Sequence, residues 1–204
     1  NITTTDAASS ITVNTSALRL MDDATTGDSV TRSLTTNNGL VKLETVTTET
    51  TDENILQVTA GLGNVTVDGA VGVNGGAVVR GVDVVSAGAV LFDSTVDLGA
   101  GNLLVGSGSA VTSTTLDAAT NVASNVDINT GTLTVNGVLT TTAGGTVTVT
   151  NTGVAAINAN IVSAGNVLFD SVGQIDLAAN ITTTDAASSI TVNTSALRLM
   201  DDAT

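Results

Sequence analysis

The chain has 204 residues and a formal charge of −14, from 19 acidic and 5 basic residues. It contains no Pro, Cys, His, Trp or Tyr. This composition excludes disulfide frameworks, zinc sites built on His or Cys, and Ser–His–Asp catalysis. The acidic surface that it predicts repels nucleic acids and anionic lipids, so neither is expected as a partner.

The prevalence of β-branched residues predicts an all-β fold with little or no helix. Thr and Val together make up a third of the chain, and both favour strands. The glycines, with frequent Asn, Ser and Asp, favour turns between those strands. Only 1% of the residues are aromatic, so Val, Leu, Ile and Ala must fill the interior. Such fillers suit a narrow column better than a wide sphere.

The first segment with candidate chemistry spans residues 16–28. Its start, SALRLMDD, is compatible with a short helical turn. Asp22, Asp23 and Asp28 lie in a Gly-containing turn and offer the carboxylate oxygens that calcium prefers. We interpret them as a candidate calcium site and expect no other cofactor. Asp22 and Asp23 are also the best carboxylate pair for acid–base chemistry, but strand neighbours point to opposite faces. We therefore predict that the chain is not an enzyme.

The next segment, residues 33–56, differs from the rest of the chain in charge and rhythm. It carries Lys42, the only lysine, and all three glutamates. It also breaks the rhythm of glycine-led strands found elsewhere. We interpret it as a lateral insertion or as a polar-faced pair of strands.

Short strands headed by glycine recur along the remaining chain. Within most of them apolar residues alternate with Thr, which is the pattern of a half-buried strand. Asn or Asp usually closes the strand, where a sharp corner is expected. The segments are 63–68 (GNVTVD), 88–93 (GAVLFD), 131–136 (GTLTVN), 145–150 (GTVTVT) and 165–170 (GNVLFD).

An internal echo indicates that the chain was built from smaller units. Residues 85–94 (VSAGAVLFDS) match residues 162–171 (VSAGNVLFDS) with one difference in ten. Phe92 and Phe169 occupy equivalent places in the two copies, and we expect both to fill the core at matched coils. Between the copies, residues 116–126 are the only other stretch compatible with a helical turn.

The two ends of the chain are identical in sequence. Residues 1–25 and 180–204 both read NITTTDAASSITVNTSALRLMDDAT. Chance cannot give such an identity. We therefore interpret residues 1–179 as one full tandem repeat unit and residues 180–204 as the start of the next identical repeat.

Two architectures accommodate these strands: a β-solenoid, and a string of immunoglobulin-like sandwiches. Sandwich cores usually contain Trp or Tyr and their loops contain Pro, and this chain has neither. Stacked coils favour ladders of Val, Leu and Ile inside and of Thr, Asn and Ser outside. The composition therefore favours the solenoid. Coils of about 20 residues would make about nine turns and about 43 Å per unit.

The strand pattern resembles a known group of repeat proteins. Residues 85–111 and 131–153, with glycine-led Val/Leu/Thr strands and Ala-Gly corners, look like the repeats of filamentous-haemagglutinin-like exoproteins and other giant bacterial surface proteins. The resemblance implies a right-handed parallel β-helix, secretion to the cell surface, and a role in adhesion or envelope structure.

Two functions are compatible with this reading of the sequence. The first is a structural repeat of a long extracellular fibre, sheath or surface filament, which associates with copies of itself end to end and laterally. The second is an adhesin passenger or stalk that presents a face, with residues 33–56 as the place to look, to a surface glycan or protein. Neither requires insertion into a membrane.

Overall fold

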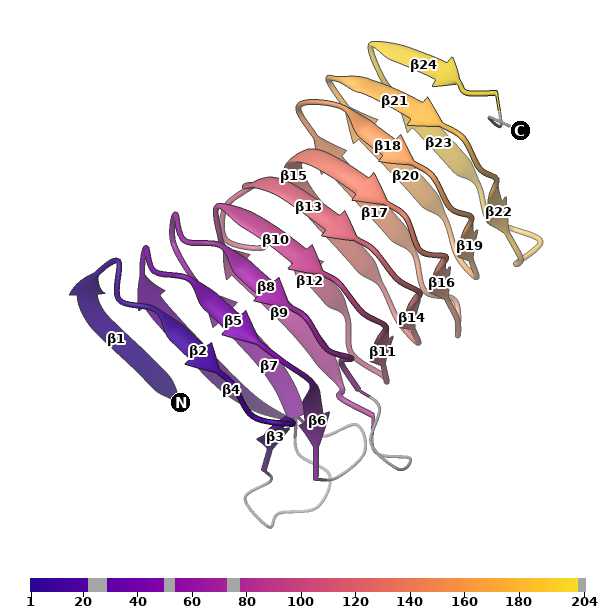
Figure 1. Ribbon diagram of the computed structural model, residues 1–204. Coiled ribbons are helices and arrows are strands. Elements are labelled where there is room, and N and C mark those ends of the chain that lie inside the picture. Colours follow the sequence, from indigo (N-terminus) through magenta and orange to yellow (C-terminus); the bar gives the residue numbers. More distant parts are fainter. Residues whose placement is uncertain (22–28, 50–53, 73–77, 202–204) are drawn as a thin grey trace.

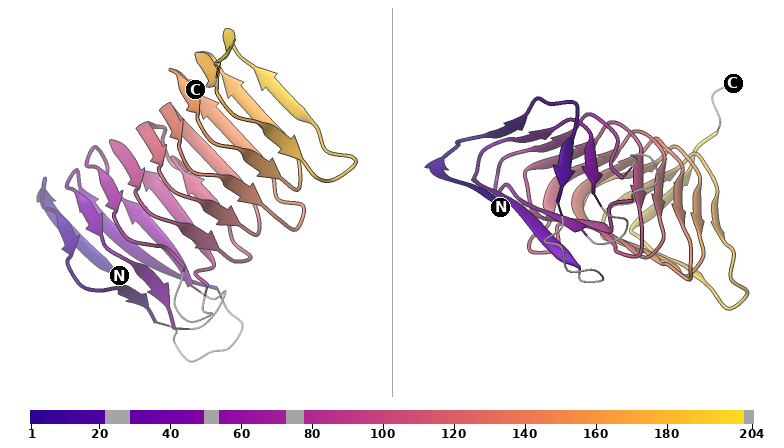
Figure 2. Two further views of the ribbon diagram at one scale, coloured as in Figure 1. Left: turned by 45° about the vertical axis from the view of Figure 1, so that its right-hand side comes forward. Right: turned by 90° about the horizontal axis from the view of Figure 1, so that it is seen from below.

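The chain folds as a β-solenoid in which parallel strands stack along one axis (Figure 1). The structure, a computed structural model, describes residues 1–21, 29–49, 54–72 and 78–201. The described part contains strands and no helix. This confirms the predicted all-β solenoid and excludes the alternative of separate sandwiches. The right-hand view of Figure 2 shows the coils as successive loops, one after another along the axis.

The first face of the solenoid is a continuous parallel ladder from one end of the molecule to the other. Its strands are β1 (Ile2–Ala7), β4 (Val30–Asn37), β7 (Asn54–Thr59), β9 (Gly81–Ser86), β12 (Leu103–Val105), the first half of β15 (Val126–Val135), β17 (Val147–Asn151), β20 (Val167–Ser171) and β23 (Ile190–Asn193).

The second face is reached from the first by one corner and forms a ladder of its own. Its strands are β2 (Ile11–Val13), β5 (Val41–Leu43), β8 (Val65–Val67), β10 (Ala89–Phe92), β13 (Val111–Leu116), the second half of β15, β18 (Ala155–Ile157), β21 (Gln174–Leu177) and β24 (Ala196–Leu199).

The third face closes each coil with short strands. A single bridging residue, Val71, continues the ladder from Val46 to Val96. The strands are β3 (Leu18–Leu20), β6 (Val46–Thr48), β11 (Val96–Leu98), β14 (Thr120–Val122), β16 (Leu139–Thr141), β19 (Ile161–Ser163) and β22 (Ile181–Thr183).

Alternate residues of each strand point into one apolar column. The predicted glycine-led strands follow this rule: Val147 and Val149 of β17 are buried, whereas Thr148 and Thr150 are not. Phe92 and Phe169 are both buried in the column, as expected. They do not lie on the same face, however, since Phe92 belongs to β10 and Phe169 to β20.

One expectation about local structure needs correction. The described parts of the two stretches compatible with helical turns are extended: residues 16–23 contain β3, and residues 116–126 contain β14. The segment 33–56 runs within the stack in its described part, where it supplies the end of β4, all of β5 and β6, and the start of β7.

The length of a turn varies along the axis, as the sequence separation of hydrogen-bonded partners in successive coils shows. Near the N-terminal end this separation is 32, 24 and 26. At the corner asparagines farther along it is 23, 21, 20 and 23. The expectation of about nine coils per unit was therefore too high, because most turns are longer than the length assumed for them. The partners are Asn1 and Ser33, Asn38 and Leu62, Gln57 and Asp83, Asn102 and Asn125, Asn125 and Thr146, Asn160 and Asn180, and Asn166 and Ser189.

Candidate functional site: the ends and corners of the stack

The predicted calcium site cannot be placed. Asp22, Asp23 and Asp28 lie outside the described residues. Asp201, the copy of Asp22, is described and exposed, two residues after the end of β24. Among the residues that the structure describes, no group of three His, Cys, Asp or Glu side chains could hold a metal ion.

Two described carboxylates on the sides of the solenoid, Asp97 and Asp117, pair with amides of the next coil. Asn121 Nδ2 donates to Asp97 Oδ1 at 2.7 Å, and Asn136 Nδ2 donates to Asp117 Oδ1 at 2.7 Å. Such pairs link coils and satisfy the carboxylate with a neutral donor. These two pairs therefore contribute to the ladder between coils.

Asparagines at several corners, each directly before a strand, continue the backbone ladder through their side chains; they include Asn102, Asn125, Asn160 and Asn166. Asn102 Oδ1 accepts from the backbone N–H of Asn125 at 3.2 Å, and Asn125 Oδ1 accepts from the N–H of Thr146 at 2.9 Å. Farther along, Asn166 Oδ1 accepts from the N–H of Ser189 at 2.8 Å. In these three cases the asparagine of one coil accepts from the coil that follows it in the chain.

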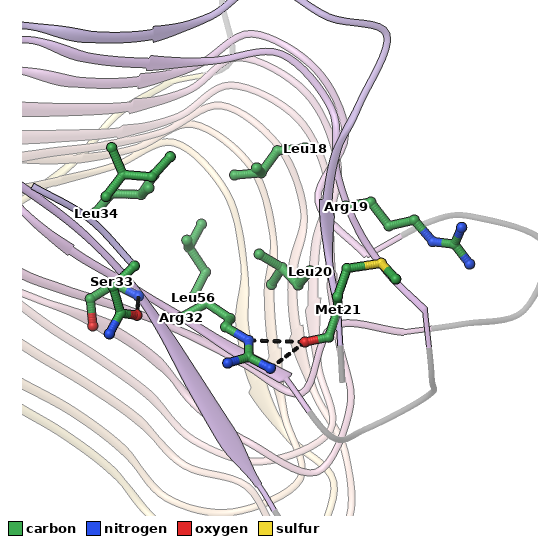
Figure 3. A pocket seen from close by; sticks show the side chains of 10 residues that line it. Leu18, Arg19, Leu20, Met21, Arg32, Ser33, Leu34 and Leu56 are labelled. Atoms are coloured by element: carbon green, nitrogen blue, oxygen red, sulfur yellow. Dashed lines mark hydrogen bonds between the residues drawn. The ribbon is translucent and has the colours of Figure 1, made fainter. Parts of the chain in front are cut away.

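The open N-terminal end exposes the end of the apolar column (Figure 3). A hollow of about 280 Å³ is lined mainly by Leu18, Leu20, Leu34 and Leu56, which point into it. Arg32 closes one side, since its guanidinium donates to the backbone oxygen of Met21 at 2.9 and 2.5 Å. The hollow is therefore apolar at its centre and polar only at its rim.

The C-terminal end has a matching hollow of about 310 Å³. Ile190 and Leu197 at its edge are 44% and 49% exposed, and Leu199 is 73% exposed. These three residues occupy inward positions of their strands, in register with inward residues of the preceding coil. Among the described residues, no further coil covers them. The hollow is lined by Phe169, Ile175, Leu177, Ala179, Asn180, Ile181, Ile190, Val192 and Leu197.

Ion pairs lie close to both ends. At the C-terminal end the Arg198 guanidinium contacts Asp176 through Nε at 2.9 Å and Nη2 at 2.6 Å, which lowers the pKa of that carboxyl. Near the N-terminal end Lys42 Nζ lies 2.6 Å from Asp68 Oδ2, and the hydrogen bond to Asp68 raises the lysine pKa. Each pair joins neighbouring coils of the second face or its corner.

A further hollow lies on the side of the solenoid, outside the first face. It has a volume of about 400 Å³ and its lining includes Ile55, Arg80, Asp83, Asn102 and Asn125. Unlike the end hollows, it is mostly polar. It has the size of a small-molecule or sugar site.

Comparison with models of protein families, with curated proteins and with solved structures finds no match for this chain. In the part of the chain that the structure describes, no helix is long and apolar enough to span a bilayer.

The corner asparagines were missed in the sequence, although a signal for them exists. Asn102 and Asn125 stand directly before an apolar–x–apolar triplet, as in Asn102-Leu-Leu-Val and Asn125-Val-Asp-Ile, and Asn166-Val-Leu-Phe has the same form. The glycines predict the strands, whereas these asparagines were interpreted only as turn residues.

Proposed function

We propose that this chain is a structural repeat of a long extracellular fibre, sheath or surface filament whose stiffness comes from stacked β-coils. The observation that carries the proposal is the combination of a continuous solenoid with identical sequences at its two ends. A stack that repeats its own first segment is suited to being extended by more of the same sequence.

The two ends support this proposal because each is suited to receive another coil. In the described structure the terminal strands present backbone N–H and C=O groups on their outer side, and such edges template pairing with further strands. The hollow behind each edge is apolar. Covering it with another coil would remove that apolar surface from water, which is favourable.

The sides of the molecule support end-to-end over lateral growth. Outward positions are mostly Thr, Asn, Asp and Ser, and the net charge of −14 makes the sides of neighbouring molecules repel. Location outside the cell rests on the resemblance to secreted repeat proteins and forms part of the proposal.

Electron microscopy and sedimentation of the purified chain test the proposal. We expect filaments one solenoid wide, and we expect the double variant Ile2→Lys with Leu199→Lys to remain monomeric because it places charge at both ends. The matched control is Leu62→Lys, which changes an 81% exposed leucine at a side corner. A parent chain that stays monomeric at high concentration, or a Leu62→Lys variant that also loses filaments, contradicts end-to-end assembly.

A second candidate is an adhesin that binds a surface glycan or protein, and the polar side hollow favours it. Its lining combines Arg80, Asp83 and Asn125, which are donors and acceptors suited to a sugar. Binding to a panel of immobilised glycans should then be lost in Asp83→Ala while filaments persist. Equal binding by Asp83→Ala and by the parent chain would exclude this hollow as the site.

A further inference from the structure

The two copies of the repeated terminal segment, residues 1–25 and 180–204, occupy different faces of the solenoid. Ile11–Val13 forms β2 on the second face, where it pairs with β5. Its copy lies in β23 on the first face, where Ile190 pairs with Val167 of β20. Identical residues therefore lie in ladders that are one face apart.

The other strands of the segment move in the same direction by the same amount. β1 lies on the first face and the corresponding strand β22 on the third. β3 lies on the third face and the corresponding strand β24 on the second. The whole segment is thus displaced by one face, which is one third of a turn.

The internal echo shows the same displacement. Residues 90–92 (VLF) lie in β10 on the second face, and residues 167–169 (VLF) lie in β20 on the first face. Both phenylalanines are nonetheless buried. A strand of this sequence can therefore be seated on more than one face, since every face offers the same apolar column on one side and water on the other.

The count of strands explains the displacement. Residues 1–179 contain twenty-three described strand segments, taking Val71 as one and the halves of β15 as two. With three segments to a turn, the repeat advances by seven and two-thirds turns. The echo behaves alike, because eleven segments separate β10 from β20, which is three and two-thirds turns.

The two copies use opposite edges of the same strands. Thr12 pairs with Lys42 of the coil that follows it, whereas its copy Thr191 pairs with Leu168 of the coil that precedes it. In both copies the isoleucine and valine that flank this threonine face the apolar column. One segment can therefore hold a preceding and a following coil at once, without a change of register.

Side chains at the segment also serve both neighbours. The backbone N–H of Asn180 donates to Asn160 Oδ1 of the preceding coil at 3.0 Å. Its copy Asn1 accepts through Oδ1 from the N–H of Ser33 in the following coil at 3.0 Å. Placed in one chain, these bonds form an uninterrupted asparagine ladder of the kind seen at Asn102 and Asn125.

The arginine of the segment has an acidic partner on each side. Arg198 pairs with Asp176 of the preceding coil, and its copy Arg19 lies 3.4 Å from Glu49, which follows β6 in the next coil. A single arginine at the junction of two units would therefore lie between the carboxylates of both.

We propose that the C-terminal end of the stack is the docking surface for a second copy of the unit 1–179, joined through the shared segment and turned by one face. This inference rests on the proposed tandem fibre. A side feature such as the hollow near Asp83 then faces each of three directions in successive units. It returns to the same side after three units, or twenty-three turns, which is about 110 Å at the spacing of parallel strands.

Engineered cysteine pairs test the position of the terminal segment, because the chain contains no cysteine of its own. Neighbouring outward positions on parallel strands lie within the Cα separation that a disulfide spans. We expect Leu168→Cys with Thr191→Cys to form a disulfide under mild oxidation. Asp176→Cys with Thr191→Cys should not, since that pair would meet only if the segment kept the face of its first copy.

A control variant and a distance measurement guard against a negative result that comes only from failed oxidation. Asp127→Cys with Thr148→Cys, an in-register pair in the middle of the first face, is the positive control. Spin labels then compare Thr191 with Leu104 on the first face and with Thr115 on the second face. If the terminal segment is turned by one face, the distance from position 191 to position 104 should be the shorter of the two. A disulfide between positions 176 and 191, or the shorter distance to position 115, overturns the inference.

The second unit itself is tested in a chain extended by a further copy of the unit 1–179. A cysteine at position 191 should crosslink with a cysteine at the counterpart of Lys42 in the added unit, and absence of that crosslink overturns the junction. These results are separate from fibre formation. Crosslinks without filaments would contradict the proposed function alone, and filaments without the crosslinks would contradict the rotation alone.

Discussion

The N-terminal and C-terminal coils of the solenoid share one core but differ in the length of their turns. The sequence separation between hydrogen-bonded partners in successive coils runs from 24 to 32 near the N-terminal end. At the corner asparagines from Asn102 onward it runs from 20 to 23. The buried residues are nevertheless of the same kind in both regions, chiefly Val, Leu and Ile. The kind of residue at the inward positions therefore stays the same while the turn length changes.

This difference follows from where the free energy of stacking arises. Inward side chains and backbone ladders are repeated in every coil, and each loses contacts if it is displaced. Lengthening a surface connection costs little, because the entropy of loop closure grows only slowly with length. The comparison predicts that core and tight corners are sensitive to substitution in both regions, and the following variants test this in order of effect.

The largest effect is expected from emptying the core. Phe169→Ala and Phe92→Ala each remove a fully buried ring and should destabilise by about 3–5 kcal/mol in chemical denaturation. Leu168→Ala, at the outward neighbour of Phe169, is the matched control and should cost far less. Similar losses for Phe92 and Phe169 would show that the core is equally tight in the long and short coils. A much smaller loss for Phe92→Ala would show that long turns loosen it.

A tight corner of a short coil should be the next most sensitive. A Cβ at Gly137 would lie 2.0 Å from the carbonyl carbon of Ala118 in the preceding coil, so Gly137→Ala should cost about 3 kcal/mol. Gly144 has a φ of +77° and open space around it. Gly144→Ala should cost about 1–2 kcal/mol through its backbone conformation alone. Thermal unfolding of both variants checks this order. The reverse order would show that the corner at Gly137 can accommodate a methyl group.

Loss of one corner asparagine should have a smaller effect. Asn125→Ala removes the acceptor for the Thr146 N–H and should cost about 1 kcal/mol. Asn125→Asp keeps an acceptor oxygen and should recover most of that loss. The control is Asn129→Ala, whose side chain makes only a 3.5 Å contact with the oxygen of Gly106. Hydrogen exchange of the Thr146 amide reports the local effect, and unchanged exchange in Asn125→Ala would exclude a role for the ladder.

The smallest effects concern the ion pairs, which should give the two regions opposite pH dependence. Asp176 has a lowered pKa because of Arg198, so its contribution is present above the ordinary value of 3.8 and is lost as pH falls through the lowered pKa. Lys42 has a raised pKa because of Asp68, so its contribution is present below 10.5 and is lost as pH rises through the raised pKa.

Residue-resolved hydrogen exchange across pH measures these contributions. Asp176→Asn should reduce the sensitivity of β24 to acid, and Lys42→Met should reduce the sensitivity of β5 to alkali. Asp170→Asn, which removes an exposed carboxylate from a neighbouring strand, is the control for net charge. A reversed pattern, with acid affecting β5 and alkali affecting β24, would contradict the assignment.

Alternation and glycine corners predicted half-buried strands such as residues 147–150, and the absence of Trp, Tyr and Pro then favoured the solenoid over sandwiches. The face on which a strand lies could not be predicted. All three faces present the same apolar interior, so the shared sequence of β2 and β23 does not specify the face on which the strand lies. The end hollows also depend on which coils are adjacent, and adjacency follows from the total number of strands, not from any local motif.

The direction of the ladders has a mechanical consequence. Backbone hydrogen bonds between coils run parallel to the axis, so a pull along the axis loads them one rung at a time and not all together in shear. The terminal coil would detach first, and its residues would then extend. The turn from Asn160 to Asn180 spans 20 residues, and its extended length is about 65–70 Å against the roughly 4.8 Å that it occupies in the stack. Under tension such a molecule would lengthen in steps of one turn and absorb work without rupturing the main chain.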